Sequence, residues 1–449
     1  MGMNDDLIED VRTAIRNAGA TPLEDAVGQM SPAEWARVVS RLPDYEMPLA
    51  LRQLSDDLMP QVVAEMDAGI GARIVQRLTR SEGADLLSAM DPDDATDLIV
   101  KLSAGTADQI LERMTPESAG RIRQLIAYPS DSAGGRMTPE FVALVPELTA
   151  DQAIAAIRAA AKTFETTYYT YVVDEAERFC GVISLHELVI APPETPVRSL
   201  MVTNPVSVRV DTDQEDAARL LIQRNLLAIP VLDSDDRLVG IITEDDVADV
   251  LVEEATEDIE RLGGSQPLET PYRHASIFLL FRKRIVWLLA LFVAEAYTGS
   301  VMRIFEDELA QVVALAFFIP LLLGTGGNIG SQITTTLVRA MAVEELSLRD
   351  ARWVLGKEAG VGIVIGGVMA AVAFGRAEIL GVGSDVAMVV AITIAVISLW
   401  SSLVAAVLPM VLRRLKFDPT VVSAPFITTL VDGTGLVIYF SIAKVVLDL

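Results

Sequence analysis

The sequence contains almost none of the soft or imidazole side chains that bind transition metals. Cys180 is its one cysteine, and His186 and His274 are its two histidines, in a chain of 449 residues. A disulfide framework is therefore excluded, and so are the cysteine- and histidine-based sites that zinc or copper usually needs. Any metal that this chain binds should be a hard cation that prefers oxygen ligands.

Basic residues are scarce in the first 280 residues, which contain 49 acids and 23 bases and carry the whole net charge of −26. Such a surface repels nucleic acid and anionic lipid and attracts cations, so we expect no nucleic-acid partner. It is either a well-solvated surface or a cation-sensing module. The N-terminal stretch MGMNDDLIEDV lacks the basic and apolar regions of a signal peptide. No nucleophile–base set or phosphate-binding loop is evident, so we do not expect an enzyme.

Residues 1–130 contain apolar residues that recur every twelve positions. The repeating positions are Met30, Leu42, Leu54, Met66, Leu78, Met90, Leu102 and Met114. Most are followed by patterns such as SPAEW or TPESA, in which Ser or Thr can cap a helix and Pro fits its first turn. Eight short helices of this kind bury their apolar stripes against one another, so the pattern predicts an acidic α-solenoid.

Residues 131–245 contain two copies of one α/β pattern. The strand-like TYYTYVV leads through Asp174 to FCGVISLHEL, and AIPVL leads through Asp233 to LVGIITEDDV. Gly181 and Gly240 occupy the same place in the two copies, 59 residues apart. The double pattern resembles a tandem pair of CBS domains, and the resemblance implies a nucleotide as a possible ligand.

Residues 246–272 begin with a helical stretch whose acids crowd one another. The acids are Asp246, Asp249, Glu253, Glu254, Glu257 and Asp258. Like charges four residues apart destabilise a helix by a few tenths of a kcal/mol per pair, roughly, and a bound cation would relieve that repulsion. The alternative is a solvated connecting helix.

Five apolar segments follow, at residues 285–302, 311–338, 359–375, 386–411 and 421–446. Each has at least about 17 residues, enough for a helix to cross about 30 Å of hydrocarbon. Ten basic residues flank these segments on one side and three on the other, which places the acidic half in the cytoplasm. We therefore expect a multi-pass protein of the cell (inner) membrane, with its C-terminus outside because the number of spans is odd.

The expected fold class is thus multidomain. It comprises an all-α solenoid over residues 1–130, the tandem α/β pair over 131–245, a connecting helix over 246–272 and an all-α, five-span membrane domain over 273–449.

Two of the five segments contain residues that break helices. Pro320 and four glycines interrupt the second, and Pro425, Gly433 and Gly435 lie in the fifth. Unwound backbone at membrane depth is tolerated only where it is buried in protein or lines water. The glycines serve either this purpose or close helix packing.

Asp432 lies inside the fifth segment, where a carboxylate costs about 2.5–3.5 kcal/mol at the bilayer centre. No Lys, Arg or His lies in the interior of any expected span, and Glu295 is the only other deep acid, either functional or interfacial. A cation pathway therefore explains Asp432 better than a structural ion pair. Mg²⁺ fits because it keeps most of its waters and takes only one or two carboxylates, such as two Asp432 residues across a dimer axis.

PLLLGTGGNIGSQ, PFITTLVDGTGLVIYF and VEEATEDIERLGG, together with the order of the domains, resemble the MgtE family of magnesium channels over nearly the whole chain. The resemblance implies a homodimer in the lipid bilayer, with a pore at its axis where Asp432 binds hydrated Mg²⁺. Thr428 and Ala424 would also contribute to this ion site. Residue 424 is Ala here, where some members have Asn, so only its backbone carbonyl could take part. Residues implied in pore structure are Pro320, Gly326, Gly327, Asn328, Pro425 and Gly435.

The resemblance also implies that Mg²⁺ bound to the cytosolic half holds the connecting "plug" helix against the pore. The matching acids are Asp93, Asp97, Asp246, Asp249, Glu254, Glu257 and Asp258, while Asn225 stands where a further acid might be expected. The function expected is a Mg²⁺-selective channel closed by intracellular Mg²⁺. The alternatives are a membrane-anchored sensor of divalent cations or nucleotides, a transporter that also accepts Mn²⁺ or Co²⁺, and a nucleotide-regulated anion channel.

Overall fold

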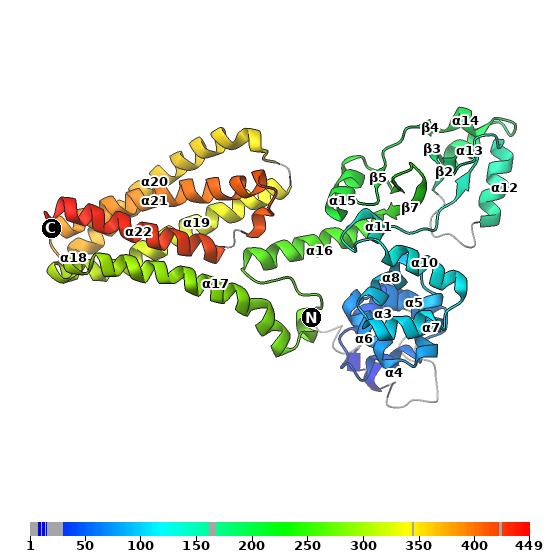
Figure 1. The fold of residues 1–449 in the computed structure, drawn as a ribbon, viewed down its shortest axis with the longest axis horizontal. Coiled ribbons are helices and arrows are strands. Elements are labelled where there is room, and N and C mark those ends of the chain that lie inside the picture. Colours follow the sequence, from blue (N-terminus) through cyan, green and yellow to red (C-terminus); the bar gives the residue numbers. More distant parts are fainter. Residues whose placement is uncertain are drawn as a thin grey trace. The chain divides into compact units, whose positions relative to one another are not determined.

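The computed structural model describes residues 30–160, 168–343, 345–421 and 424–449, with a few positions between Ile8 and Ile15. It forms two compact units (Figure 1). The first unit runs to Glu254 and includes Glu269–His274, and the second comprises Ala255–Leu268 and Ala275–Leu449.

The first unit contains the eight helices that the twelve-residue repeat predicts. They are α3 (Pro32–Val39), α4 (Met47–Leu51), α5 (Leu58–Ala64), α6 (Ala68–Arg77), α7 (Arg80–Ser88), α8 (Pro92–Val100), α9 (Ala104–Leu111) and α10 (Pro116–Ile126). Ser31 and Thr79 make complete capping boxes with the Glu three residues later, which fixes where α3 and α7 begin. The repeat residues are buried or pack against one common core, so this prediction is confirmed.

The two α/β copies form two small sheets. The first has the order β1 (Ala143–Leu144), β2 (Tyr169–Val173), β3 (Phe179–Ser184) and β4 (Val202–Thr203); the second has β5 (Val208–Arg209), β6 (Ala228–Leu232) and β7 (Leu238–Thr243). The helices of this region are α11 (Ala133–Arg136), α12 (Ala150–Ala160), α13 (Leu185–Ile190), α14 (Val197–Leu200) and α15 (Gln214–Gln223).

The strand register repeats between the copies. Val172 lies opposite Gly181 in the first sheet, and Val231 lies opposite Gly240 in the second. A Cβ on Gly240 would lie 2.6 Å from the sulfur of Met137, and one on Gly181 would lie 3.2 Å from the sulfur of Met201, so the methionine at the start of each copy packs on the glycine of the other copy. The repeat seen in the sequence is therefore a repeat in three dimensions.

The connecting helix α16 (Glu244–Leu262) leaves the second copy and is exposed along most of its length. Val247 and Val250 are its buried residues. It ends before Gly263, and Gly264 adopts a φ of 75°, a conformation that few other residues tolerate. The helix therefore ends at this glycine pair, ten residues before the end of the predicted connecting segment, 246–272.

The second unit is helical. It contains α17 (Ile277–Ile304), α18 (Glu306–Gln311), α19 (Ile319–Ala342), α20 (Ala351–Leu380), α21 (Ser384–Arg414) and α22 (Ala424–Val446) (Figure 1). Helix α21 contributes many of the buried residues and packs against α19, α20 and α22.

Four of these helices, in the part of the chain that is described, are long and apolar enough to cross a membrane, so the prediction of five spans is corrected. They correspond to Val313–Ala342, Leu348–Leu380, Ser384–Arg414 and Ala424–Val446. The missing one lies within α17. Its apolar run is limited to residues 285–294, because Arg282–Arg284 precede it and the more polar EAYTGS follows it.

The prediction that two membrane helices are broken is wrong. Pro320 and Pro425 each occupy the second position of a helix, α19 and α22, where the missing N–H has no partner to lose. Helix α19 continues through its glycines, and the short 3₁₀ helix Val313–Phe318 precedes it. Pro409, by contrast, lies inside α21, for which no irregularity was predicted.

Candidate functional site

Asp432 lies in the middle of α22 and is partly buried. Its Oδ1 atom is buried and accepts no hydrogen bond from any described residue. The charged residue that acts on it electrostatically is another acid, Glu295 of α17. A buried carboxylate oxygen without a donor is costly unless a cation or water satisfies it. Asp432 therefore has a buried oxygen that a cation or water could satisfy.

The residues one and two turns before Asp432 are bonded to each other. The Thr428 hydroxyl donates to the Ala424 carbonyl at 3.0 Å, and the Ser331 hydroxyl of α19 donates to the same carbonyl at 3.4 Å. A carbonyl oxygen has two lone pairs, and both are used here. The Ala424 carbonyl thus links α22 to Ser331 of α19, and Thr428 lies one turn before Asp432 on the same helix.

The glycines of α19 allow α22 to approach closely. A Cβ on Gly327 would lie 2.8 Å from Cγ2 of Thr428, and one on Gly330 would lie 2.5 Å from Cγ2 of Ile427. Gly326 is similarly closed by Val431 and Ile397. These contacts favour packing, one of the two roles that the sequence left open. Asn328, between them, is exposed.

Next to Asp432, Gly433 makes room for a side chain of α17. A Cβ there would lie 2.0 Å from Cε1 of Tyr297. Gly435, in contrast, has only an ordinary contact, at 3.4 Å from Cδ1 of Ile397. Gly433 thus determines how closely α17, with Glu295, can lie to Asp432.

In the first unit, Asp93 of α8 and Asp246 of α16 are brought together. Burial raises the pKa of Asp93 well above its usual range, and the nearby Asp246 carboxylate raises this pKa further. Burial also raises the pKa of Asp246, to about 6. Asp93 Oδ1 is buried without a hydrogen-bond partner. Two half-buried acids on which no described basic residue acts could share a hydrated cation.

Asp97 has a different environment, because Arg136 neutralises it. The Arg136 guanidinium donates to Asp97 at 3.1 Å, to Gln214 at 2.7 Å and to Glu253 of α16. Gln214 in turn donates to Glu254 at 2.5 Å. A protein cation therefore already bridges the helical domain and the connecting helix at this point, where the sequence predicted a metal ion.

The remaining predicted sensor acids lie farther along α16 or have their own partners. Burial, and then the nearby Asp245, raise the pKa of Asp249, whereas Arg136 lowers it. Glu257 pairs with Arg261. Across the described residues, no group of three or more His, Cys, Asp or Glu side chains is placed to hold a metal. The predicted sensor set, including Asp258, is thus spread along α8 and α16.

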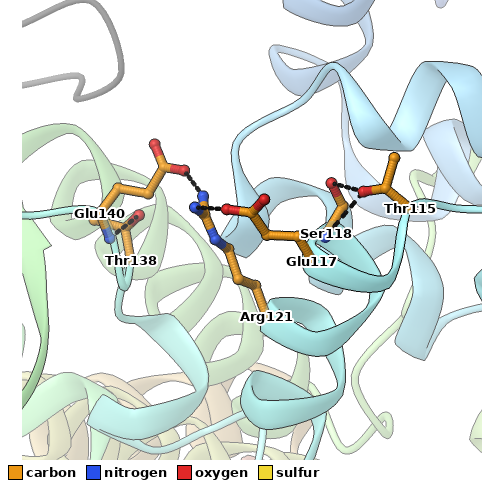
Figure 2. Close-up of polar contacts among 6 residues, drawn as sticks. All are labelled: Thr115, Glu117, Ser118, Arg121, Thr138 and Glu140. Carbon is orange, nitrogen blue, oxygen red and sulfur yellow. Dashed lines mark hydrogen bonds and ion pairs between the residues drawn. The ribbon is translucent and has the colours of Figure 1, made fainter.

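A second basic residue ties the helical domain to the tandem pair. Arg121 of α10 pairs with Glu140 at 2.6 Å and with Glu117 at 2.9 Å (Figure 2). Sequence reasoning missed both Arg121 and Arg136, because their partners lie up to 117 residues away in the chain. For Arg136, the available signal was its position in SAGGR, a basic residue between two acidic regions that could each supply a carboxylate partner.

An acidic helical domain, a tandem CBS pair and a bundle of apolar helices with a buried carboxylate define a membrane transporter of cations with a regulatory cytosolic half. Family models match all three parts: "MgtE intracellular N domain" at residues 30–131, "CBS domain" at 133–194 and 197–253, and "MgtE: Divalent cation transporter" at 319–442. The chain belongs to the MgtE family.

Two relatives show how far the similarity extends. The magnesium transporter MgtE of Thermus thermophilus is 43% identical over 75% of this chain and 74% of its own length. The magnesium transporter MgtE of Enterococcus faecalis is 36% identical over 73% of this chain and 72% of its own. Among solved structures, the cytosolic domain of the Mg²⁺ channel MgtE in complex with ATP superposes with a TM-score of 0.52 at 30% identity, covering 54% of this chain and 99% of that one.

Proposed function

We propose that this protein is a Mg²⁺-selective channel for magnesium uptake that intracellular Mg²⁺ closes. The observation that carries the proposal is Asp432, whose buried oxygen has no donor and whose charged neighbour is another acid. A hydrated Mg²⁺ satisfies such a carboxylate through its water shell. Mg²⁺ is here the transported ion and the regulator, and the chain's own role is binding and transport, with no catalytic step.

Gating is assigned to the contact between α8 and α16. Asp93 and Asp246 repel each other when both are ionised, and a shared Mg²⁺ replaces that repulsion with ligation. Mg²⁺ then favours the arrangement that holds the two helices together. Because Arg136 already links Asp97 to Glu253, we assign the Mg²⁺ response first to Asp93 and Asp246, with Asp249 as a further contributor.

The assembly is proposed to be a homodimer that places two Asp432 residues at a common axis. One carboxylate per chain is few for a divalent ion, and two would also discriminate against monovalent ions. Cross-linking in membranes should give a dimer band.

A second site is proposed in the CBS pair for a nucleotide, as in the relative solved with ATP. Equilibrium binding of ATP to the purified protein tests it.

The cytoplasmic position of the acidic half follows from the basic flanks of the membrane helices. The predicted position of the C-terminus outside needs an odd number of crossings. The four candidate spans give an even number, so the prediction holds only if α17 also crosses the membrane. A cysteine at Leu449, in a Cys180→Ser background, reports the side by its labelling with an impermeant reagent. Labelling from outside intact cells supports the predicted topology, and labelling only after permeabilisation refutes it.

Mg²⁺ flux into proteoliposomes that contain a Mg²⁺-sensitive dye tests the proposed function. We expect uptake that saturates with external Mg²⁺ and falls when the cytosolic face is exposed to Mg²⁺. Competition by Mn²⁺ and Co²⁺ in the same assay measures selectivity. A protein that binds Mg²⁺ but supports no flux would instead be a membrane-anchored sensor.

A further inference from the structure

The last turn of α16 is attached to the segment that leads into α22, the helix of Asp432. Arg261 of α16 pairs with Asp418, in the loop between α21 and α22. The other carboxylate oxygen of Asp418 accepts a hydrogen bond from the Thr420 N–H at 2.8 Å, at the start of the 3₁₀ helix Pro419–Val421. One carboxylate therefore contacts both the connecting helix and the 3₁₀ helix Pro419–Val421, the last described element before α22.

The turn after α16 makes a second attachment to the same place. A Cβ on Gly264 would lie 2.8 Å from Cδ1 of Trp287 and 3.6 Å from Cγ of Pro425, in the first turn of α22. The Trp287 ring lies 6.3 Å from that of Phe426. All these residues belong to the second compact unit. The end of the connecting helix and the beginning of α22 thus form one packed group.

Arg261 also has an acidic partner on its own helix. Glu257, one turn earlier, forms an ion pair with it, so Arg261 lies between Glu257 and Asp418. Mg²⁺ bound by Glu257 would compete with Arg261 for that carboxylate. Arg261 would then interact with Asp418 alone, and the attachment of α16 to the start of α22 would become stronger.

We propose that the Arg261–Asp418 pair couples the position of α16 to α22, so that Mg²⁺ bound in the cytosolic half acts on the pore through it. This inference rests on the proposed function. Arg261 and Asp418 are positioning residues: neither contacts Asp432, and both act through the segment that orients its helix. The pair is about one-third exposed on each side, so its loss should weaken the coupling without unfolding the unit.

The test records channel currents of the full-length protein in inside-out patches while Mg²⁺ at the cytosolic face is varied. The variants are Arg261→Gln, Asp418→Asn and the double variant; Asn keeps an oxygen for the Thr420 N–H. We expect currents at low Mg²⁺ like those of the unaltered protein, and a concentration for half-closure that is about fivefold higher in each single variant. The double variant should be no worse than either single one, because both remove the same contact.

Controls separate coupling from general damage. Lys444→Gln removes the pair with Glu308 at 2.8 Å, in the same unit but away from α16, and should leave half-closure unchanged. Arg261→Lys should restore part of the response. Half-closure that is unchanged in Arg261→Gln and Asp418→Asn overturns the inference, as do single-variant effects that add in the double variant. If the unaltered protein carries current but cytosolic Mg²⁺ does not close it, the proposed gating fails instead.

Discussion

At the scale of single residues, the acids of this chain differ in what balances their charge. Asp432 and Asp93 each have a buried oxygen without a donor, and their charged neighbours include other acids. Asp97 and Glu253 share the guanidinium of Arg136. No described basic residue balances the charge in the first environment, whereas the protein itself supplies the cation in the second. Arg136 should therefore set how much of the closed arrangement exists without Mg²⁺.

Replacing Arg136 by Gln tests this role. Without the guanidinium, Asp97 and Glu253 repel each other, and loss of a hydrogen bond between charged groups costs about 1.5–3 kcal/mol. In Mg²⁺-free buffer we expect proteolysis within α16 to be roughly tenfold faster or more, and saturating Mg²⁺ should restore most of the protection.

The matched control is Arg121→Gln, which loses two ion pairs of similar length and no contact with α16 (Figure 2). It should leave cleavage within α16 as it is in the unaltered protein. Equal cleavage rates for the Arg136→Gln and unaltered proteins without Mg²⁺ would show that Arg136 does not hold the helix.

The raised pKa of Asp246, about 6, predicts that Mg²⁺ and protons compete. Because this folded-state pKa lies above the ordinary value of 3.8, the folded protein keeps a proton on Asp246 through about pH 5 and releases it by pH 7. Mg²⁺ must displace that proton at low pH, so its apparent affinity should rise several-fold from pH 5 to pH 7.

The Mg²⁺ concentration that half-protects α16 from protease measures this affinity. In Asp246→Asn the affinity should be lower and its dependence on pH weaker. A Mg²⁺ midpoint that is the same at pH 5 and pH 7 in the unaltered protein would exclude Asp246 as a ligand.

At the scale of helices, local sequence predicted the beginnings of elements better than their interiors. The capping residues and twelve-residue repeat gave the eight helices of residues 30–126, because each signal acts within one turn. Pro320 and Pro425 were misread as breaks, because a proline in the first turn and one in the interior look alike when the helix start is unknown. The small residues between α19 and α22 were visible, but which helix they contact was not.

The contact between α19 and α22 predicts the effect of a single methyl group. Gly330→Ala would place Cβ 2.5 Å from Ile427 and 2.9 Å from the Ser401 hydroxyl, so the helices must separate. We expect a loss of about 1–3 kcal/mol in stability, seen as a lower melting temperature in detergent.

Gly324→Ala is the matched control, because nothing lies within 4 Å of its Cβ. It should be neutral or stabilising by up to about 1 kcal/mol, the difference in helix propensity. If both variants melt alike, close packing at Gly330 is not what holds α19 against α22.

At the scale of the whole molecule, the order of the parts was readable because each has its own period or composition. Contacts between parts could not be read from the sequence. The partners of Arg136 are 39 and 117 positions away in the chain, and Asp418, the partner of Arg261, is 157 positions away. No local pattern reports such pairings. The number of membrane helices was also mispredicted. It depends on the whole of α17, whose charged and polar flanks leave an apolar run too short for a candidate span.

The central claim is that Asp432 binds the transported ion. Asp432→Asn removes its charge and keeps its shape, and Mg²⁺ flux into dye-loaded proteoliposomes measures the consequence, with Asp307→Asn, an acid outside the four candidate spans, as the control. We predict that Asp432→Asn reduces flux at least about tenfold, the effect of losing about 1.4 kcal/mol of ion binding, while the control transports normally. Normal Mg²⁺ flux through Asp432→Asn would contradict the assignment.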